Sequence, residues 1–153
     1  MKRIISGIKE LEDLEGTELG VSDWLVIEQE RIDLFAEATG DRQWIHVDRE
    51  RAQRESPFGT TIAHGHLILS LTPKLLSEIV EVKGVRLLVN PGFDRVRIRT
   101  PVRCGDRIRM RATLKKLRAL AGGAMHGTIH FKFEIEGQRK PTAFGDALIV
   151  YYP

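Results

Sequence analysis

The sequence predicts an α+β fold in which a curved antiparallel sheet wraps around one long, buried helix. Residues 64–80 are apolar around nearly the whole circumference of a helix, as expected of a helix that is buried on every side. The half of the chain that follows alternates apolar and polar residues with a period of two, which is typical of antiparallel strands with one buried face. Because the helix needs a cover and each strand needs a partner for its apolar face, the two patterns fit together as a sheet folded around the helix.

The long helix is expected from His64 to Val80. Pro73 lacks a backbone donor, so we expect a kink at that position. Thr60 or Thr61 is expected to cap the helix start, because a hydroxyl oxygen can accept from a free backbone N–H. The apolar residues that predict this helix are Leu67, Ile68, Leu69, Leu71, Leu75, Leu76, Ile79 and Val80.

Two shorter helices are expected earlier in the chain. Residues 28–39 place Ile32, Phe35 and Ala36 on one face, and Gly40 follows as a C-terminal stop. Residues 48–55 form a short, highly charged second helix. The first of these helices is therefore amphipathic, and its apolar face is expected to be buried.

The strands are expected around residues 95–99, 107–114, 128–135 and 147–152, with a hairpin turn at 121–123. A single long helix inside a curved antiparallel sheet is the hot-dog arrangement. We expect residues 1–153 to form one such domain. The sheet would leave edge strands, which a second copy could cover, so we also expect a homodimer.

Composition excludes several classes of protein. With Cys104 as the one cysteine, neither an internal disulfide nor a cysteine-based zinc site can form. No segment approaches the roughly 20 apolar residues of a membrane span, and the first residues lack the apolar core of a signal peptide. We therefore expect a cytoplasmic protein that is not inserted in a membrane.

Basic residues are concentrated in one part of the chain, although the formal net charge is only +3. Residues 86–118 hold eleven Lys or Arg side chains and two acids, Asp94 and Asp106. Such a surface favours an anionic partner, with a solvated sheet face as the alternative. Phe131 and Phe133 fall on the apolar phase of their strand, so no aromatic side chains are offered for base stacking, and we expect no nucleic acid partner.

Asp41 and His46 are the candidate catalytic residues. They lie in the loop after Gly40, where a carboxylate and an imidazole can share one water molecule and do general acid–base chemistry. The alternative is structural, with Asp41 accepting from backbone amides and His46 as a half-buried loop residue. Spacing alone favours the structural interpretation.

Gly65 is the candidate binding residue at the start of the long helix. Its free N–H could stabilise a carbonyl oxygen that gains negative charge during a reaction, although a tightly packed helix start is equally compatible. His64 and His66, with His46 and Asp41, raise the question of a metal site. Residues two apart on a helix do not face the same side, so we expect no metal.

At these residues the sequence resembles the MaoC-like dehydratases, the (R)-specific enoyl-CoA hydratases of the hydratase 2 type. The signature has an aromatic residue, Gly-Asp, usually Asn-Pro, then His, and a small residue further on. The resemblance covers the chain from Trp24 onward. It rests on Phe35–Asp48, Ala52, Pro57–Gly59, Ile62–Gly65, Val96-Arg97, Pro101-Val102 and Gly105-Asp106.

One departure from the family pattern concerns Gln43 and Trp44, which stand where most members have Asn-Pro. The amide is retained one methylene further from the backbone, whereas the fixed φ of proline is lost. Gln-Trp-Ile-His resembles a branch of the family that includes nodulation-protein-N-like hydratases. The departure leaves Asp41 and His46 in place.

The resemblance implies an activity and roles for the candidate residues. Asp41 and His46 would activate water for addition to a trans-2-enoyl thioester, giving an (R)-3-hydroxyacyl thioester. Gln43, His64 and Gly65 would bind the substrate, with the Gly65 amide on the thioester carbonyl. No cofactor is implied beyond the CoA thioester itself. The strand arginines would hold its phosphates, and an acyl carrier protein is the alternative carrier.

Two other functions remain open from the sequence. A hot-dog thioesterase generally needs a carboxylate on or near the central helix, and the only acid between His64 and Val80 is Glu78, close to the far end. A non-catalytic acyl-CoA-binding module could keep the fold and the basic face without any need for Asp41. Turnover of an enoyl-CoA distinguishes both from a hydratase.

Overall fold

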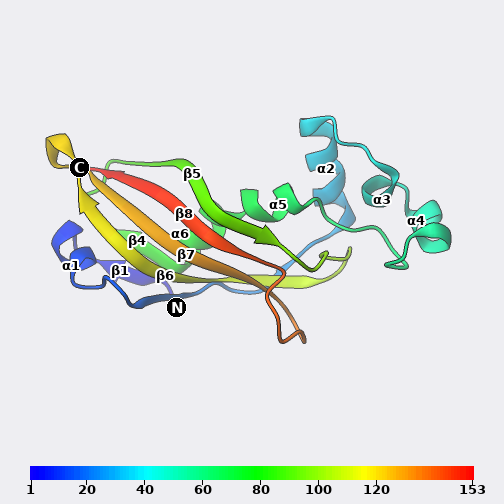
Figure 1. The fold of residues 1–153 in the computed structure, drawn as a ribbon, viewed down its shortest axis with the longest axis horizontal. Helices are drawn as coiled ribbons and strands as arrows, with labels where there is room; N and C mark the ends of the chain where they lie inside the picture. The colour runs from blue at the N-terminus through cyan, green and yellow to red at the C-terminus, as the bar shows by residue number, and fades with distance from the viewer.

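A computed structural model describes residues 1–153, and in it two consecutive helices lie along a curved sheet (Figure 1). The sheet has the strand order β2-β6-β7-β8-β5, with β3 also paired to β6. A separate parallel pair is formed by β1 and β4. This is the α+β fold expected from the sequence.

The strands are β1 (Arg3–Ile5), β2 (Glu18–Val21), β3 (Leu25–Val26), β4 (Val80–Val82), β5 (Leu87–Ile98), β6 (Arg107–Ala119), β7 (Met125–Ile135) and β8 (Ala143–Tyr152). The helices are α1 (Ile8–Glu12), α2 (Gln29–Thr39), α3 (Trp44–Val47), α4 (Arg49–Glu55), α5 (Gly65–Ser70) and α6 (Thr72–Ile79), with a short 3₁₀ turn at Ala121–Gly123. In Figure 1, α2, α3 and α4 are grouped beyond one end of the sheet, and α5 leads from them along the sheet.

The concave face of the sheet is apolar, as the alternating pattern predicts. On β6 and β7 the core residues lie directly opposite one another, with Met110 beside Phe133 and Ala112 beside Phe131. Burial of each large side chain stabilises the fold by roughly 1.5–3 kcal/mol. All eight residues predicted for this face on these two strands are at most 3% exposed: Ile108, Met110, Ala112, Leu114, Ile129, Phe131, Phe133 and Ile135.

The central helix differs from the prediction, because it is divided at Leu71 into α5 and α6. Pro73 lies in the first turn of α6, where a proline is tolerated, so the division precedes it and Pro73 itself does not kink a continuous helix. Since Pro73 has no N–H for the Leu69 carbonyl, the Thr72 hydroxyl donates to that oxygen at 2.7 Å. The two helices together span the predicted segment, but the prediction that it is buried on every side is wrong, because Lys74 and Ser77 are exposed to solvent.

The helix start also differs from the prediction. His64 occupies the N-cap position, and no side chain caps α5. The expected cap from Thr60 or Thr61 is therefore wrong; the Thr61 hydroxyl instead donates to Gln29. The earlier helices are confirmed as α2 and α4, whereas α1, α3 and the short strands β1 to β4 were not predicted.

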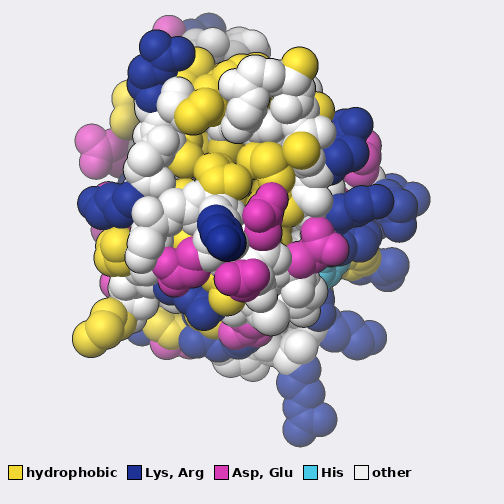
Figure 2. All heavy atoms as spheres, turned by 90° about the vertical axis from the view of Figure 1, so that its left-hand side faces the viewer, with side chains coloured by type: hydrophobic (Ala, Val, Ile, Leu, Met, Phe, Trp, Pro, Cys, Tyr) yellow, Lys and Arg dark blue, Asp and Glu magenta, His cyan; other side chains and the backbone are white.

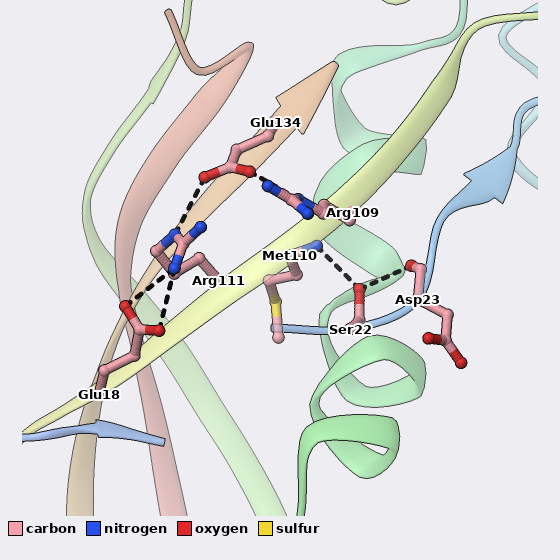
Figure 3. A network of polar contacts seen from close by, with 7 residues as sticks. All are labelled: Glu18, Ser22, Asp23, Arg109, Met110, Arg111 and Glu134. Atoms are coloured by element: carbon pink, nitrogen blue, oxygen red, sulfur yellow. Dashed lines mark hydrogen bonds and ion pairs between the residues drawn. The ribbon is translucent and has the colours of Figure 1, made fainter. Parts of the chain in front are cut away.

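Ion pairs bind the strands together on the convex face (Figure 3). Glu134 of β7 accepts from Arg109 at 2.7 Å and from Arg111 at 3.0 Å, both on β6. Arg111 also pairs with Glu18 of β2 at 2.9 Å. Burial alone would raise the pKa of Glu134, but the bonds from Arg109 and Arg111 outweigh it and hold this pKa below its usual range.

Asp146 of β8 is a nearly buried carboxylate on the same face, at 4% exposure. Lys115 and His130 each approach one of its oxygens at 2.9 Å. Burial by itself would raise the pKa of Asp146, but the hydrogen bonds from Lys115 and His130 outweigh it, so the pKa is lowered.

The lowered pKa predicts a loss of stability in acid. A carboxyl group with a depressed folded-state pKa stabilises the fold above its unfolded pKa of about 3.9, and this contribution is lost as pH falls through the lower folded value. We expect Asp146→Asn to lower the free energy of unfolding at pH 7 by about 1–3 kcal/mol, because it removes the charge facing Lys115. Urea unfolding at pH 7 and at pH 3 measures this. The deficit should shrink at pH 3, and an equal deficit at both values would contradict it.

Strand β5 lies at the edge of the sheet and exposes apolar side chains. None of its residues is buried, and Leu87, Leu88, Val89 and Ile98 are 51%, 56%, 40% and 46% exposed. Hydrophobic side chains also gather on the end of the protein where β5 begins, bordered there by charged residues (Figure 2). None of the helices combines the length and apolar character needed to cross a membrane.

Candidate active site

Asp41 follows the end of α2 directly. Gly40 adopts the left-handed conformation at φ 78° and ends the helix, so the chain turns before α3 begins at Trp44. Asp41 is exposed, and the backbone N–H of Gln43 lies 3.4 Å from its Oδ1. The turn thus leaves the Asp41 carboxylate largely free.

His46 lies on α3 and is 6% exposed. Its Nδ1 is 2.7 Å from the carbonyl oxygen of Ile62, so Nδ1 carries the proton and donates. Burial lowers the pKa of His46; the bond to Ile62 and the charge of Asp41 oppose this, and His64 adds to it. The ring is therefore neutral at pH 7, with Nε2 free to accept a proton.

His64 lies against both candidate catalytic residues and is 3% exposed. Its Nε2 donates to the backbone carbonyl of Asp41 at 2.9 Å. Its ring stacks on that of His46, with centroids 3.8 Å apart, and also contacts Phe35. The side chain therefore fixes the backbone of the Asp41 turn, and its Nδ1 is left without a hydrogen-bond partner.

Asp41, His46 and His64 are also the residues that could offer ligands to a metal, since their ligand atoms all lie within 4.8 Å of one another. A metal ion must lie close to the plane of each imidazole that binds it. The stacked rings of His46 and His64 are tilted by only 23°, so their planes do not meet near these nitrogens. One ring would have to turn before both could bind one ion.

A cavity of about 250 Å³ adjoins His46. Gly65 forms part of its wall, and an added Cβ at this position would lie 2.6 Å from Cδ1 of Ile98 on β5. As the first residue of α5, Gly65 has no acceptor for its N–H within the helix. The other lining residues are Phe58, Ile62, Ala63, Ile68, Arg99, Thr100, Pro101, Val102 and Thr142.

A second cavity, of about 560 Å³, lies further along the helices, between α6 and the first half of β5. Its apolar wall includes Leu76, Val80 and Ile149, and Lys2, Lys83 and Arg86 lie among its lining residues. Both cavities follow the same side of the α5–α6 pair. The second is at the α6 end, away from His46.

Several of the basic residues between Arg86 and Arg118 are neutralised within the protein. Arg107, Arg109, Arg111 and Lys115 each form an ion pair with a carboxylate from another part of the chain. Arg99 makes no ion pair and lines the cavity with His46 and Gly65. The backbone N–H of Arg99 donates to the carbonyl of Thr142. Shortly before Thr142 in the chain are Arg139 and Lys140, which are exposed and form no ion pair.

The family described as MaoC like domain matches residues 10–131 of this sequence. The chain belongs to the MaoC-like dehydratases. The 3-hydroxyacyl-thioester dehydratase Z of Mycobacterium tuberculosis is 42% identical over 149 residues, which cover 97% of this chain and 98% of the relative. Nodulation protein N of Rhizobium leguminosarum bv. viciae is 43% identical over 127 residues, 82% of this chain and 79% of that protein.

The fold of this dehydratase is also similar to that of a solved (R)-hydratase from A. caviae that is involved in PHA biosynthesis. The TM-score is 0.69 at 24% sequence identity, and the match covers 90% of this chain and 98% of the other. The hot-dog fold predicted from the sequence is thereby confirmed.

The predicted site residues of the dehydratase are not all brought together. Asp41, His46 and His64 meet, and Gly65 lies in the cavity wall beside His46. Gln43 is exposed, is the N-cap residue of α3, and does not line that cavity. A role for Gln43 in substrate binding remains a prediction.

Two buried polar residues of the candidate site were not predicted to belong to it: Gln29, 3% exposed, and Thr61, 1% exposed. Gln29 donates to the backbone carbonyl of His46, and the Thr61 hydroxyl donates to Gln29. A signal for Gln29 was present, because it precedes Ile32 by three and Ala36 by seven positions and so shares the apolar face of α2. No comparable pattern marks Thr61, which lies in an irregular segment.

Proposed function

We propose that the protein hydrates trans-2-enoyl-CoA thioesters to (R)-3-hydroxyacyl-CoA and catalyses the reverse dehydration. The observation that supports this most directly is the buried, neutral His46 ring, which lies beside a cavity walled by Gly65 and has a ring nitrogen within 4.8 Å of a carboxylate oxygen of Asp41. A carboxylate and a neutral imidazole this close to each other can together activate a water molecule.

In the proposed mechanism, water is held between the Asp41 carboxylate and His46 Nε2. The thioester carbonyl faces the N–H of Gly65, which stabilises the negative charge that develops on its oxygen. The water oxygen bonds to the β-carbon while the pair takes up one water proton. A proton from the pair then reaches the α-carbon, so that one water is added across the double bond and the pair returns to its starting state. We propose Asp41 as the principal base, although two coupled groups titrate together.

The two cavities suggest where the rest of the substrate lies. The reacting carbons fit the smaller cavity at Gly65, and we propose that a longer acyl chain follows α5 and α6 toward the cavity lined by Leu76 and Ile149. Arg99, with Arg139 and Lys140, would hold the phosphates of CoA outside the smaller cavity. The alternative carrier, an acidic acyl carrier protein, would use the same charges.

This placement predicts salt-dependent binding of the CoA part. Raising the ionic strength from about 0.05 to about 0.5 M shortens the Debye length severalfold and weakens exposed arginine–phosphate contacts. We expect KM for crotonyl-CoA to rise severalfold while kcat changes little, since the acid–base pair does not contact the phosphates. Initial rates at the two ionic strengths measure both constants. An unchanged KM would remove the assignment of phosphate binding to these side chains.

The exposed edge strand predicts a homodimer. Leu87, Leu88, Val89 and Ile98 on β5 expose apolar surface next to unpaired backbone groups, and pairing with a second copy would cover both. We expect light scattering to give twice the chain mass at micromolar concentration. A monomeric mass at that concentration would contradict this arrangement.

The proposed activity is tested by incubating the protein with crotonyl-CoA and a thiol reagent. A hydratase removes the enoyl absorbance without releasing thiol, whereas a thioesterase releases thiol, and a binding module does neither. Glu78, the only acid on the helix pair, is bound to Lys74 and lines neither cavity, which disfavours hydrolysis. A series of enoyl-CoAs of rising chain length then defines the acyl preference, and chiral analysis of the product tests the (R) configuration.

A further inference from the structure

Gln29 lies in the first turn of α2 with its amide group fully buried and fully bonded. Its Nε2 donates to the backbone carbonyl of His46 at 2.7 Å and to Oδ1 of Asp33 at 2.8 Å. Its Oε1 accepts from the hydroxyl of Thr61. Both amide protons and the oxygen are thus engaged, and these partners fix the orientation of the amide.

These bonds join the two pieces of backbone that determine the position of the His46 ring. One is α3, which carries His46 and which Gln29 holds by the carbonyl of His46 itself. The other is the segment of Thr61 and Ile62, which Gln29 holds through the Thr61 hydroxyl. The carbonyl of Ile62, one residue beyond Thr61, accepts from Nδ1 of His46.

These contacts form a closed loop. From the His46 carbonyl it runs through the Gln29 amide and the Thr61 hydroxyl to the adjacent Ile62 carbonyl, which accepts from the His46 ring. The same segment is anchored from its other side, because the N–H of Cys104 donates to Thr61 and the N–H of Ala63 donates to Val102. Displacement of α3 relative to this segment would change the angle and length of the bond to Nδ1. That bond determines which ring nitrogen carries the proton.

An apolar side chain at position 29 would satisfy the packing of α2 equally well, since Ile32 and Ala36 on the same face are buried without any polar contact. Burying an amide is costly unless all its groups are bonded, so a glutamine here is stabilising only in one arrangement of its partners. The network therefore fixes the relative positions of its groups, rather than merely adding stability to the packing of α2.

We infer that Gln29 and Thr61 are positioning residues for His46, which hold its ring in the Nδ1–H form with Nε2 directed to the reacting water. The kinetic part of this inference rests on the proposed hydratase function, whereas the state of the ring does not. A displacement of the ring by about 1 Å can cost as much as 10²-fold in rate. We expect loss of either partner to lower kcat at least about tenfold and to leave KM nearly unchanged.

The test uses matched variants of the full chain. Gln29→Met replaces the amide by an apolar chain of similar length, and Thr61→Val removes the hydroxyl at nearly constant shape. Thr61→Ser keeps the hydroxyl and is the conservative rescue. Ile32→Val loosens packing on the same face of α2 without touching the network, and it is the control for a structural effect. Each variant is measured for kcat and KM on crotonyl-CoA, and its histidine ring nitrogens are observed by ¹⁵N NMR at neutral pH.

We expect one protonated Nδ1 for His46 in the parent, Thr61→Ser and Ile32→Val proteins, and a mixture of the two neutral forms in Gln29→Met and Thr61→Val, together with the fall in kcat. If Gln29→Met does not fold, the Thr61→Val and Thr61→Ser pair decides the question. Folded Gln29→Met and Thr61→Val proteins with an unchanged His46 signal would overturn the inference. An equal change in kcat and in the His46 signal of Ile32→Val would also overturn it. If the parent protein hydrates no enoyl-CoA, the proposed function fails, and the NMR comparison still tests the positioning of the ring.

Discussion

Replacing Asp41 with Asn, or His46 with Gln, is expected to lower kcat for enoyl-CoA hydration by about 10²-fold or more, the usual range for general acid–base groups. Asp41→Asn keeps the shape of the side chain but removes the basic oxygen. His46→Gln keeps some hydrogen-bonding capacity but removes the titrating ring, whose Nε2 is free in the structure. KM should change much less, because neither residue holds the CoA part of the substrate.

The double variant tests whether the two residues act on one water molecule. Groups that act as a unit are far from additive, so Asp41→Asn with His46→Gln should be little slower than the slower single variant. Circular dichroism and the urea midpoint show whether each variant remains folded. The catalytic assignment is falsified if both single variants are folded and keep near-parental kcat on every enoyl-CoA that the parent hydrates.

Much of the fold could be predicted because its core elements have simple periodicity. From Ile108 to Leu114 on β6 and from Ile129 to Ile135 on β7 every second residue is apolar, and all of those residues are buried on the concave face. The segment from Gly65 to Ile79 has its apolar residues packed against the sheet, but it is not buried on every side as predicted, because Pro73, Lys74 and Ser77 are exposed. Periodicity of this kind reports burial directly, because a strand or helix presents each face at a fixed interval.

Elements that depend on distant partners could not be predicted in the same way. Strand β3 has two residues, and β1 exists only by pairing with β4 from the end of α6, so neither carries a pattern of its own. Strand β5 shows the alternation but lies at the sheet edge, where none of its residues is buried within the chain. The division at Leu71 likewise comes before Pro73, the only residue in the segment whose type indicated a break.

The candidate site likewise has a part that could be predicted from the sequence and a part that could not. Asp41 and His46 could be found from a motif, because they are close in sequence and both follow the helix stop at Gly40. The contacts of His46 come from segments far along the chain, with Gln29 17 positions before it and Ile62 16 positions after it. Only the fold brings such residues together, and their identities alone, a glutamine and a backbone carbonyl, carry no signal of chemistry.

The second large effect is expected at Gly65. Its φ is not in the left-handed region, so the need for glycine there is one of space: a Cβ would lie 2.6 Å from Cδ1 and 3.3 Å from Cγ2 of Ile98. In Gly65→Ala, either the side chain of Ile98 or the start of α5 must shift within the wall of the cavity beside His46. A shift of about 1 Å at a reacting carbonyl can lower the rate by as much as 10²-fold, and we expect kcat/KM to fall by about that factor.

Ile98 offers the compensating change, because its side chain carries the atoms that the new methyl group would meet. Ile98 also lines the cavity and lies on the exposed edge strand, so Ile98→Ala is measured by itself to give its own effect on kcat/KM. In Gly65→Ala, the same change removes the atoms that cause the clash. The double variant should therefore recover most of the activity that Gly65→Ala loses, and steady-state rates on crotonyl-CoA for the four proteins measure that recovery. Full activity in Gly65→Ala would show that the Gly65 wall is not close to the reacting atoms. A folded double variant as slow as the single one would contradict the steric cause, because the clash with Ile98 would then be absent and the rate still low.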